Sequence, residues 1–232
     1  MSEHHLPGDP PVPLTLRRSA RARRISLRIS GLDGRVTLTL PLRVPEGEAL
    51  AFAQEKEEWI RGHLAQRPEA VKLSWGATLP LDGQPRRIIA GSGRRILLEE
   101  GRLVVPQGTD GTTPVARIRR YVQELARDRL AAASDHYASA LGRNYSRISL
   151  RDTRSRWGSC SSDGALMYSW RLVMAPPEVL RYVAAHEVAH LQEMNHSQAF
   201  WDLVQQLYGH YDGARGWLRS HGNDLHRFRF ES

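Results

Sequence analysis

Three histidines and a glutamate lie close together in the last quarter of the chain. They form the pattern H-E-x-x-H at residues 186–190, followed six residues later by His196. On a helix, His186 and His190 are one turn apart, so both imidazoles leave the same face and can bind one metal ion. Glu187 points to the side of that face, where a carboxylate reaches a metal-bound water without being a ligand. This spacing predicts a metal site.

The predicted ligand set favours a catalytic zinc ion. Three neutral imidazoles, from His186, His190 and His196, leave one position of a tetrahedral site for water. That remaining position distinguishes a catalytic zinc from a structural one. Imidazole nitrogens also bind other first-row metals, but zinc is the default for three of them. We therefore predict zinc at these three histidines, with Glu187 as the catalytic general base.

His196 has two interpretations. The same spacing occurs in metzincins, but those proteins carry a glycine where this chain has Glu193. Asn195 tolerates a left-handed conformation and can end the first helix, and Ser197 then resembles the N-cap of another. In one interpretation His196 lies in the corner between two packed helices and points back at the metal. In the other it is a surface residue that precedes an N-cap.

Two helices must position these residues. Pro176-Pro177-Glu178 is a typical helix start, because proline at the first helical position loses no hydrogen bond and an early carboxylate suits the helix dipole. The residues that follow form an apolar stripe at helical spacing, which we expect to face the core. A second helix, beginning after Ser197, has apolar residues at similar spacing through Tyr208.

Several motifs together resemble one known family. They are the segments Arg154–Cys160, Trp170–Pro177, His186–His190 and Asn195–Trp201, with the arginine-rich opening Arg17–Arg24. In combination they resemble the YgjP-like metallopeptidase family, which is related to SprT-like zinc proteases. The resemblance covers nearly the whole chain. It implies zinc bound by His186, His190 and His196, with Glu187 as general base.

The predicted function is that of a zinc-dependent metallopeptidase, a hydrolase that cleaves peptide bonds with a metal-activated water and Glu187 as base. Two alternatives are a metal-dependent nucleoside triphosphate (UTP-type) pyrophosphohydrolase and a DNA-associated SprT-like protease. In the first of these, Arg154, Arg156 or the cluster Arg17–Arg24 would bind phosphate. A non-enzymatic nucleic-acid-binding or scaffold protein with a structural zinc is a further alternative.

Composition limits the partners and the compartment. The chain has 232 residues, 41% of them hydrophobic, which suits a globular protein. Its net charge of +8 fits a surface that binds a polypeptide, a nucleotide or a nucleic acid, and equally an ordinary solvated surface. The single cysteine, Cys160, fits a reducing cytoplasm. No apolar run approaches the ~20 residues of a membrane span, so we expect no membrane partner.

The expected fold is α+β, zincin-like, with a small antiparallel sheet over the H-E-x-x-H helix. Residues 1–13 are predicted to be a disordered tail. Residues 14–110 are predicted to form a strand-rich platform that includes the hairpin of Ile25–Ile29 with Val36–Leu40 and one helix from Pro45 to about Gln66. Residues 111–232 should form the catalytic region, either separately or in one continuous domain with the platform.

Four further predictions concern surroundings of the site. Ala165–Leu172 is the candidate edge strand for an extended substrate. Tyr168 could stabilise an oxyanion. Cys160 could be a zinc ligand, although a role as a small apolar side chain packed in the core is favoured. The cluster Arg17–Arg24 could form a basic rim, although a solvated strand edge that prevents aggregation is favoured. Residues that bind substrate are not identified by the sequence.

Overall fold

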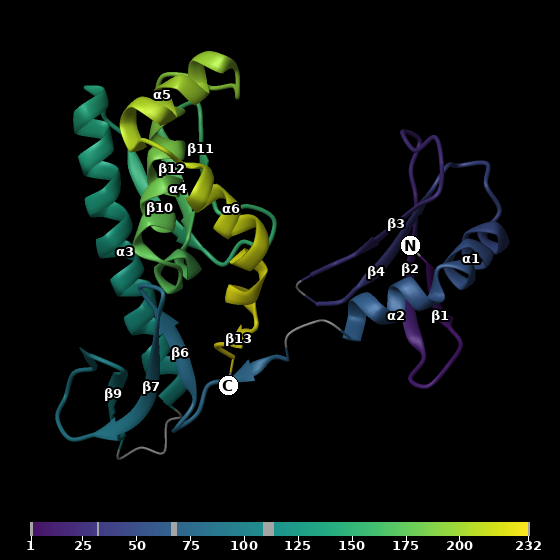
Figure 1. The fold of residues 1–232 in the computed structure, drawn as a ribbon, viewed down its shortest axis with the longest axis horizontal. Coiled ribbons are helices and arrows are strands. Elements are labelled where there is room, and N and C mark those ends of the chain that lie inside the picture. Colours follow the sequence, from purple (N-terminus) through teal and green to yellow (C-terminus); the bar gives the residue numbers. More distant parts are fainter. Residues whose placement is uncertain (1, 32, 66–68, 109–113, 232) are drawn as a thin grey trace. The chain divides into compact units, whose positions relative to one another are not determined.

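The computed structural model describes residues 2–31, 33–65, 69–108 and 114–231. The chain divides into two compact units, Met1–Glu69 and Ala70–Ser232, each with an apolar core of its own (Figure 1). The predicted boundary between residues 110 and 111 lies outside the described residues. The observed division comes earlier, because Leu79, Ile88 and Leu103 bury their side chains in the core of the second unit.

The first unit is a four-stranded sheet with two helices. Its strand order is β1-β2-β4-β3, with β2 and β4 parallel and the other pairs antiparallel. The elements are β1 (Ser2–Leu6), β2 (Val12–Arg18), β3 (Ser26–Ile29), β4 (Val36–Leu40), α1 (Glu46–Glu55) and α2 (Glu57–Ala65). The predicted hairpin is present as β3 and β4. The predicted single helix is interrupted at Lys56 and forms α1 and α2.

The predicted disordered tail is instead largely ordered. Residues 2–6 form β1, which pairs with β2 in antiparallel register. Leu6 is only 2% exposed and Val12 only 5%, so both contribute to the core of the first unit. The strand forms because it buries these apolar side chains and covers the free edge of β2.

Arg17 and Arg18 do not lie on a strand edge as predicted. They lie on β2, which is an interior strand of its sheet. The Arg18 guanidinium donates hydrogen bonds of 2.9 Å to the carbonyl oxygens of Leu42 and Val44. Arg18 therefore fixes the segment that follows β4 and does not protect an open sheet edge from aggregation.

The second unit contains a long helix, α3 (Pro114–Leu141), packed against a four-stranded and a three-stranded sheet (Figure 1). One sheet has the order β6-β7-β9-β8, and a two-stranded pair joins β5 to β13. The elements are β5 (Val71–Lys72), β6 (Thr78–Leu81), β7 (Gln84–Gly91), β8 (Leu97–Glu99), β9 (Arg102–Pro106), α3 (Pro114–Leu141) and β13 (Phe228–Arg229). The parallel pairing of β13 with β5 brings the end of the chain back to the start of this unit.

A three-stranded sheet lies beside the predicted metal helix. Its strands are β10 (Arg147–Arg151), β11 (Gly158–Cys160) and β12 (Ala165–Ser169), in the order β10-β12-β11. β10 is parallel to β12 and β11 is antiparallel to it, so the sheet is mixed and not antiparallel as predicted. β12 is the central strand, which contradicts its prediction as the substrate edge. Pairing on both sides already uses its backbone groups, and the edge next to the helix is β11.

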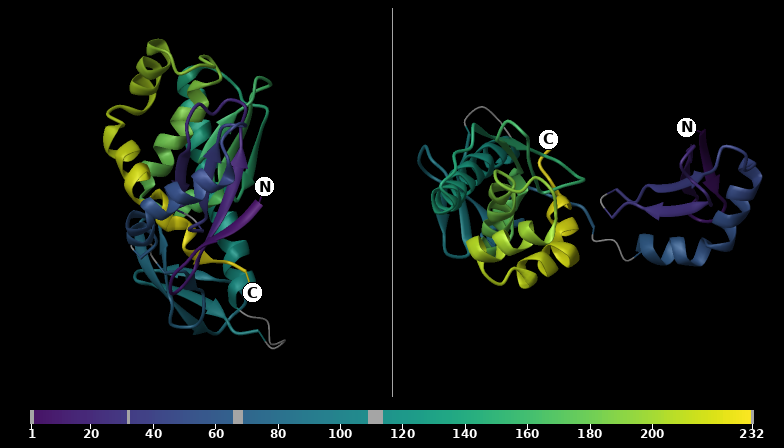
Figure 2. Two further views of the ribbon diagram at one scale, coloured as in Figure 1. Left: turned by 90° about the vertical axis from the view of Figure 1, so that its right-hand side faces the viewer. Right: turned by 90° about the horizontal axis from the view of Figure 1, so that it is seen from above.

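The helix that carries H-E-x-x-H is the centre of the second unit. It is α4 (Pro177–Ala189), and it contacts α3, β11 and the two helices that follow (Figure 2). The remaining elements are η1 (Trp170–Met174), α5 (Gln198–Tyr208), α6 (Asp212–His221) and η2 (Gly222–His226). The buried residues of α4 lie around most of the helix, whereas the sequence predicted a single apolar stripe. No helix in the described ranges combines the length and the hydropathy that a membrane span requires.

Candidate metal centre

His186, His190 and His196 form a single cluster, here called the histidine triad. Each offers one ring nitrogen, and these three atoms all lie within 4.8 Å of one another. The Nε2 atoms of His186 and His196 are 3.1 Å apart. His186 lies in the last turn of α4 and His190 is its C-cap, so the local helix brings these two together as the spacing predicted.

His196 reaches the triad through a local turn. Asn195 Oδ1 accepts a hydrogen bond of 2.9 Å from the Ser197 backbone N–H, an arrangement that turns the chain between α4 and α5. The His196 ring lies 5.1 Å from that of His186 and 4.8 Å from that of His190, measured between centroids. The structure thus brings His196 to the two helical histidines, as the ligand hypothesis requires.

Phe200 supports all three imidazoles, although the sequence identified it only as a core residue. It is fully buried in α5. Its ring is stacked on His190 at 4.4 Å and meets His186 and His196 edge-on at 4.9 and 4.8 Å. One aromatic ring therefore fixes the orientation of the three ligand candidates from the core side. Its apolar spacing in α5 was the only signal in the sequence.

The protonation states of the triad suit a metal. His190 Nδ1 lies 2.9 Å from the Glu193 carbonyl oxygen and donates to it, which leaves the Nε2 lone pair for a cation. Burial, with the neighbouring histidines, lowers the pKa of His186 to about 3, and burial also lowers the pKa of His190. Both rings are therefore neutral at pH 7, the form that binds metals. Three imidazoles, two of them held neutral by burial, are a donor set that fits zinc.

Glu187 lies beside the triad but is not part of it. Its side chain is 6% exposed, and burial raises its pKa to about 8, an effect that the nearby Arg156 opposes. A Cβ atom added at Gly158 would lie 2.6 Å from both Cγ and Oε1 of Glu187. No side chain larger than hydrogen fits there without movement. The strand β11 therefore packs its backbone directly against the predicted base.

Two other predicted participants do not point at the triad. Tyr168 is fully buried, and its hydroxyl shares a hydrogen bond of 3.0 Å with that of Ser134 on α3. It is a core residue and not an oxyanion donor. Cys160 is outside the triad, and burial together with Glu187 raises the pKa of its thiol to about 11. A protonated thiol is a poor ligand, which favours the packing role.

An ion pair between the buried Arg171 and the exposed Asp152 fixes the loop that leads into β11. Arg171 donates from Nε and Nη2 to the two carboxylate oxygens of Asp152, at 2.6 and 3.0 Å. Its Nη1 donates to the carbonyl oxygens of Leu225 and Phe228. Nearby, the rings of Trp157 and His226 lie 5.3 Å apart. These contacts join the loop at 152–157 to the C-terminal segment. Sequence spacing gave no sign of them, because the partners are far apart in the chain.

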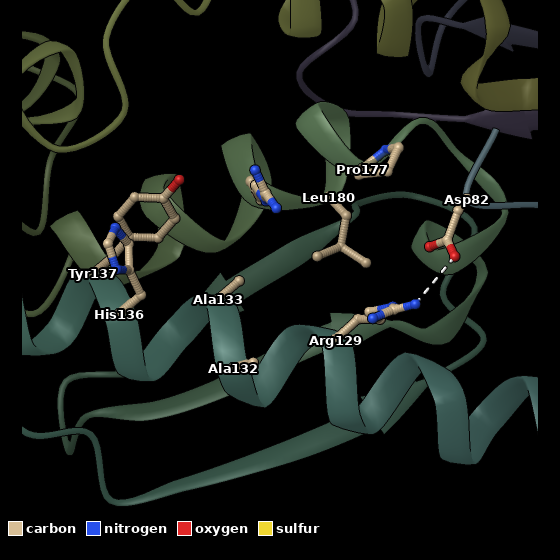
Figure 3. Close-up of a pocket in the computed structure, with 9 residues that line it drawn as sticks. Asp82, Arg129, Ala132, Ala133, His136, Tyr137, Pro177 and Leu180 are labelled. Carbon is tan, nitrogen blue, oxygen red and sulfur yellow. Dashed lines mark hydrogen bonds and ion pairs between the residues drawn. The ribbon is translucent and has the colours of Figure 1, made fainter.

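A pocket of about 590 Å³ lies between α3 and α4, away from the triad (Figure 3). Small side chains, Ala132 and Ala133, leave this space, and an ion pair of Arg129 with Asp82 at 3.3 Å stands at one end. Neither Glu187 nor any histidine of the triad lines it. On α4 its lining comes from the first turns of the helix, whereas the triad belongs to the last.

Comparison with known proteins gives one match. No curated protein matches the chain, and no solved structure does. The family model described as the YgjP-like metallopeptidase domain matches residues 23–221, which include the triad, Glu187 and β11. The resemblance inferred from the motifs is therefore confirmed, and a metal-dependent peptidase is the activity that the family description indicates. The chain belongs to the YgjP-like metallopeptidase family.

Proposed function

We propose that the protein is a zinc-dependent peptidase with a zincin-like site. The observation that carries the proposal is the convergence of three imidazoles beside a buried carboxylate in a chain of this family. His186, His190 and His196 would hold the metal, with Phe200 behind them. Bound zinc supplies a Lewis acid that acidifies water and polarises a carbonyl group.

Glu187 supplies the proton transfer. A cation bound at the triad would favour the ionised carboxylate and so offset the effect of burial on its pKa. As general base the carboxylate would remove the proton of the attacking water and then deliver it to the leaving nitrogen of the peptide bond. Close packing against Gly158 restricts the carboxylate to one position next to the triad. A carboxylate held in one position is already oriented for proton transfer from the attacking water.

The free edge of β11 can align an extended substrate. Trp157 accepts a hydrogen bond from Ser169 (2.8 Å), and Ser161 donates one to Ala165 (3.0 Å), both within the β11–β12 hairpin. Hydrogen-bonding direction alternates along an antiparallel strand, so the backbone groups of Gly158 and Cys160 point to the other side. A substrate added there would gain main-chain hydrogen bonds beside Glu187.

Replacement of Glu187 by Gln tests the proposal. The variant should bind zinc normally and lose about 10²–10⁴-fold in peptide hydrolysis, because the amide cannot accept the proton. Zinc content is measured by metal analysis, and activity by release of peptides from casein. Glu178→Gln, an exposed carboxylate on the same helix, is the matched control and should remain active. Full activity of Glu187→Gln would exclude the base role.

Binding of a nucleotide or nucleic acid by the arginine-rich surface is a second proposal, supported by the net charge of +8. Release of pyrophosphate from UTP would identify a nucleotide hydrolase. A DNA-binding affinity that falls with salt would support the DNA-associated protease. A slope near zero in a plot of log affinity against log salt concentration would exclude it. A cytoplasmic location is proposed from the single cysteine, which the structure shows unpaired.

A further inference from the structure

A cation lies one aromatic ring away from the histidine triad. The Cζ atom of Arg215, on α6, is 4.7 Å from the centroid of the Trp201 ring. The Trp201 ring is in turn 5.7 Å from the rings of both His186 and His196. Arg215 is therefore separated from two of the three histidines by the Trp201 ring alone, and it comes from a later helix of the chain.

Aromatic stacking positions this guanidinium. Trp201 is stacked on Tyr211 at 5.4 Å, and Tyr211 is stacked on Tyr182 at 5.8 Å. Tyr182 belongs to α4, so the series of rings connects Arg215 to the metal helix. Stacking uses the face of a guanidinium and leaves the N–H groups at its edge available for hydrogen bonds.

The charge of Arg215 is not neutralised by an ion pair. Its side chain is exposed, and in the described part of the chain no carboxylate lies within 4.0 Å of its nitrogens. Asp212 lies one turn earlier on α6 and forms no ion pair with it either. A stacked arginine with free donors at the rim of a site is suited to a carboxylate, which it can bind with two parallel hydrogen bonds.

A second arginine lies on the strand side of the site. Arg156 is exposed and precedes by two residues Gly158, whose backbone packs against Glu187. Positive charge thus flanks both the α6 side and the β11 side. A substrate with negative charge would be attracted on both sides, and one with basic side chains would be repelled.

We propose that Arg215 determines specificity by binding a carboxylate of the peptide substrate close to the scissile bond. The inference rests on the proposed peptidase function and adds the substrate class, acidic peptides. Two sources can supply the carboxylate, an Asp or Glu side chain or the free C-terminus of the peptide. Arg215 would contact either through its edge N–H groups while Trp201 supports its face.

Binding by the zinc-loaded Glu187→Gln protein tests the proposal without turnover. Four peptides of one backbone sequence are compared by calorimetry: neutral with an amidated C-terminus, neutral with a free C-terminus, Glu-containing and amidated, and Lys-containing and amidated. At least one carboxylate peptide should bind about tenfold or more tightly than the neutral amide, as expected for a charge-assisted hydrogen bond. Which one does so identifies the source of the carboxylate.

Two arginine variants in the same background separate a specific contact from net charge. Arg215→Ala should abolish the preference, and Arg215→Lys should retain part of it. Arg219→Ala removes the same charge from the next turn of α6 and should leave the preference unchanged. An equal preference in Arg215→Ala would overturn the proposal. So would equal or undetectable binding of all four peptides, or tight binding of UTP or DNA that depends on Arg215 where the peptides do not.

Different results would exclude the role of Arg215 and the peptidase function. Hydrolysis by the unmodified protein without preference for acidic peptides would remove the role of Arg215 and leave the peptidase function intact. An Arg215-dependent preference in binding, with no hydrolysis of any of the four peptides, would remove the peptidase function and leave Arg215 as a carboxylate-binding residue.

Discussion

The two units differ in what they bury. Among the described residues, the first unit buries apolar side chains only. Every buried polar or charged side chain belongs to the second unit: Ser134, Ser169, Arg171, Glu187, His190 and His226. Because a buried polar group costs free energy unless it is paired, the second unit requires an explanation that the first does not.

Pairing within the fold accounts for part of this burial. Arg171 has Asp152, and Ser134 has Tyr168. At the triad the pairing is incomplete, since the buried Nδ1 of His186 has no hydrogen-bond partner in the described residues. In its described part the first unit thus buries only apolar groups, whereas the second also buries Glu187 and His190, whose chemistry the proposed metal site would use.

The largest expected effect concerns the triad. His196→Ala should weaken zinc binding by more than about 100-fold, because even outer-shell partners of zinc contribute 10–100-fold to affinity. Competition with a chromogenic chelator measures it. His63→Ala, an exposed histidine of α2 in the first unit, is the control and should bind zinc normally. Unchanged affinity in His196→Ala would remove it from the ligand set and weaken the contrast between the units.

Two glycine replacements compare the surroundings of Glu187 with the first unit. Gly158→Ala should destabilise the protein by about 1–3 kcal/mol and reduce activity, because the new methyl group overlaps the Glu187 side chain. Gly62→Ala, in α2, meets no atom within 4 Å and should stabilise slightly, by about 0.5–1 kcal/mol. Urea unfolding and casein hydrolysis measure both. A neutral effect of Gly158→Ala on activity would mean that β11 does not position Glu187.

A pH dependence follows from His226. Burial chiefly, and then Arg171, with Arg154 and Arg229, lowers its pKa to about 4, against the opposing effect of Asp152. The unfolded chain, with a pKa near 6.5, takes up the proton first as the pH falls. The stability that the neutral ring contributes is therefore complete above about pH 6.5 and is lost towards pH 4, by up to about 3 kcal/mol.

Replacement of His226 by Gln measures that contribution. Urea unfolding between pH 4 and 7 should show a shallower loss of stability in the variant than in the unmodified protein. His63→Gln, in the first unit, is the control and should reproduce the unmodified curve. Parallel curves for His226→Gln and the unmodified protein would show that the ring is not held neutral by the fold.

The smallest effect is expected from separation of the units. A fragment of residues 70–232 contains one complete core and the whole triad. It should fold, bind one zinc ion per chain and hydrolyse casein at a rate close to that of the full chain. Circular dichroism, metal analysis and the casein assay check this. Zinc binding without hydrolysis would show that the first unit contributes to substrate binding. The catalytic function would then not belong to the second unit alone.

Local chemistry made part of this structure predictable. The helix start at Pro176-Pro177-Glu178, the spacing of His186 and His190, and the turn at Asn195 depend on residues within a few positions of one another. The hairpin of β3 and β4 was predictable for the same reason. By contrast, the ordering of residues 2–6 depended on pairing with β2 and burial in a core that local patterns do not reveal.

The family, the three histidines and the glutamate could all be read from the amino-acid order, because helical periodicity and short turns bring such residues together. Three features became visible in the folded chain: β11 and not β12 is the free edge, Gly158 packs on Glu187, and Arg215 stacks on Trp201 beside the triad. These arrangements depend on strand order and helix packing. Both are set by contacts between distant segments, whose side chains must fill one shared core.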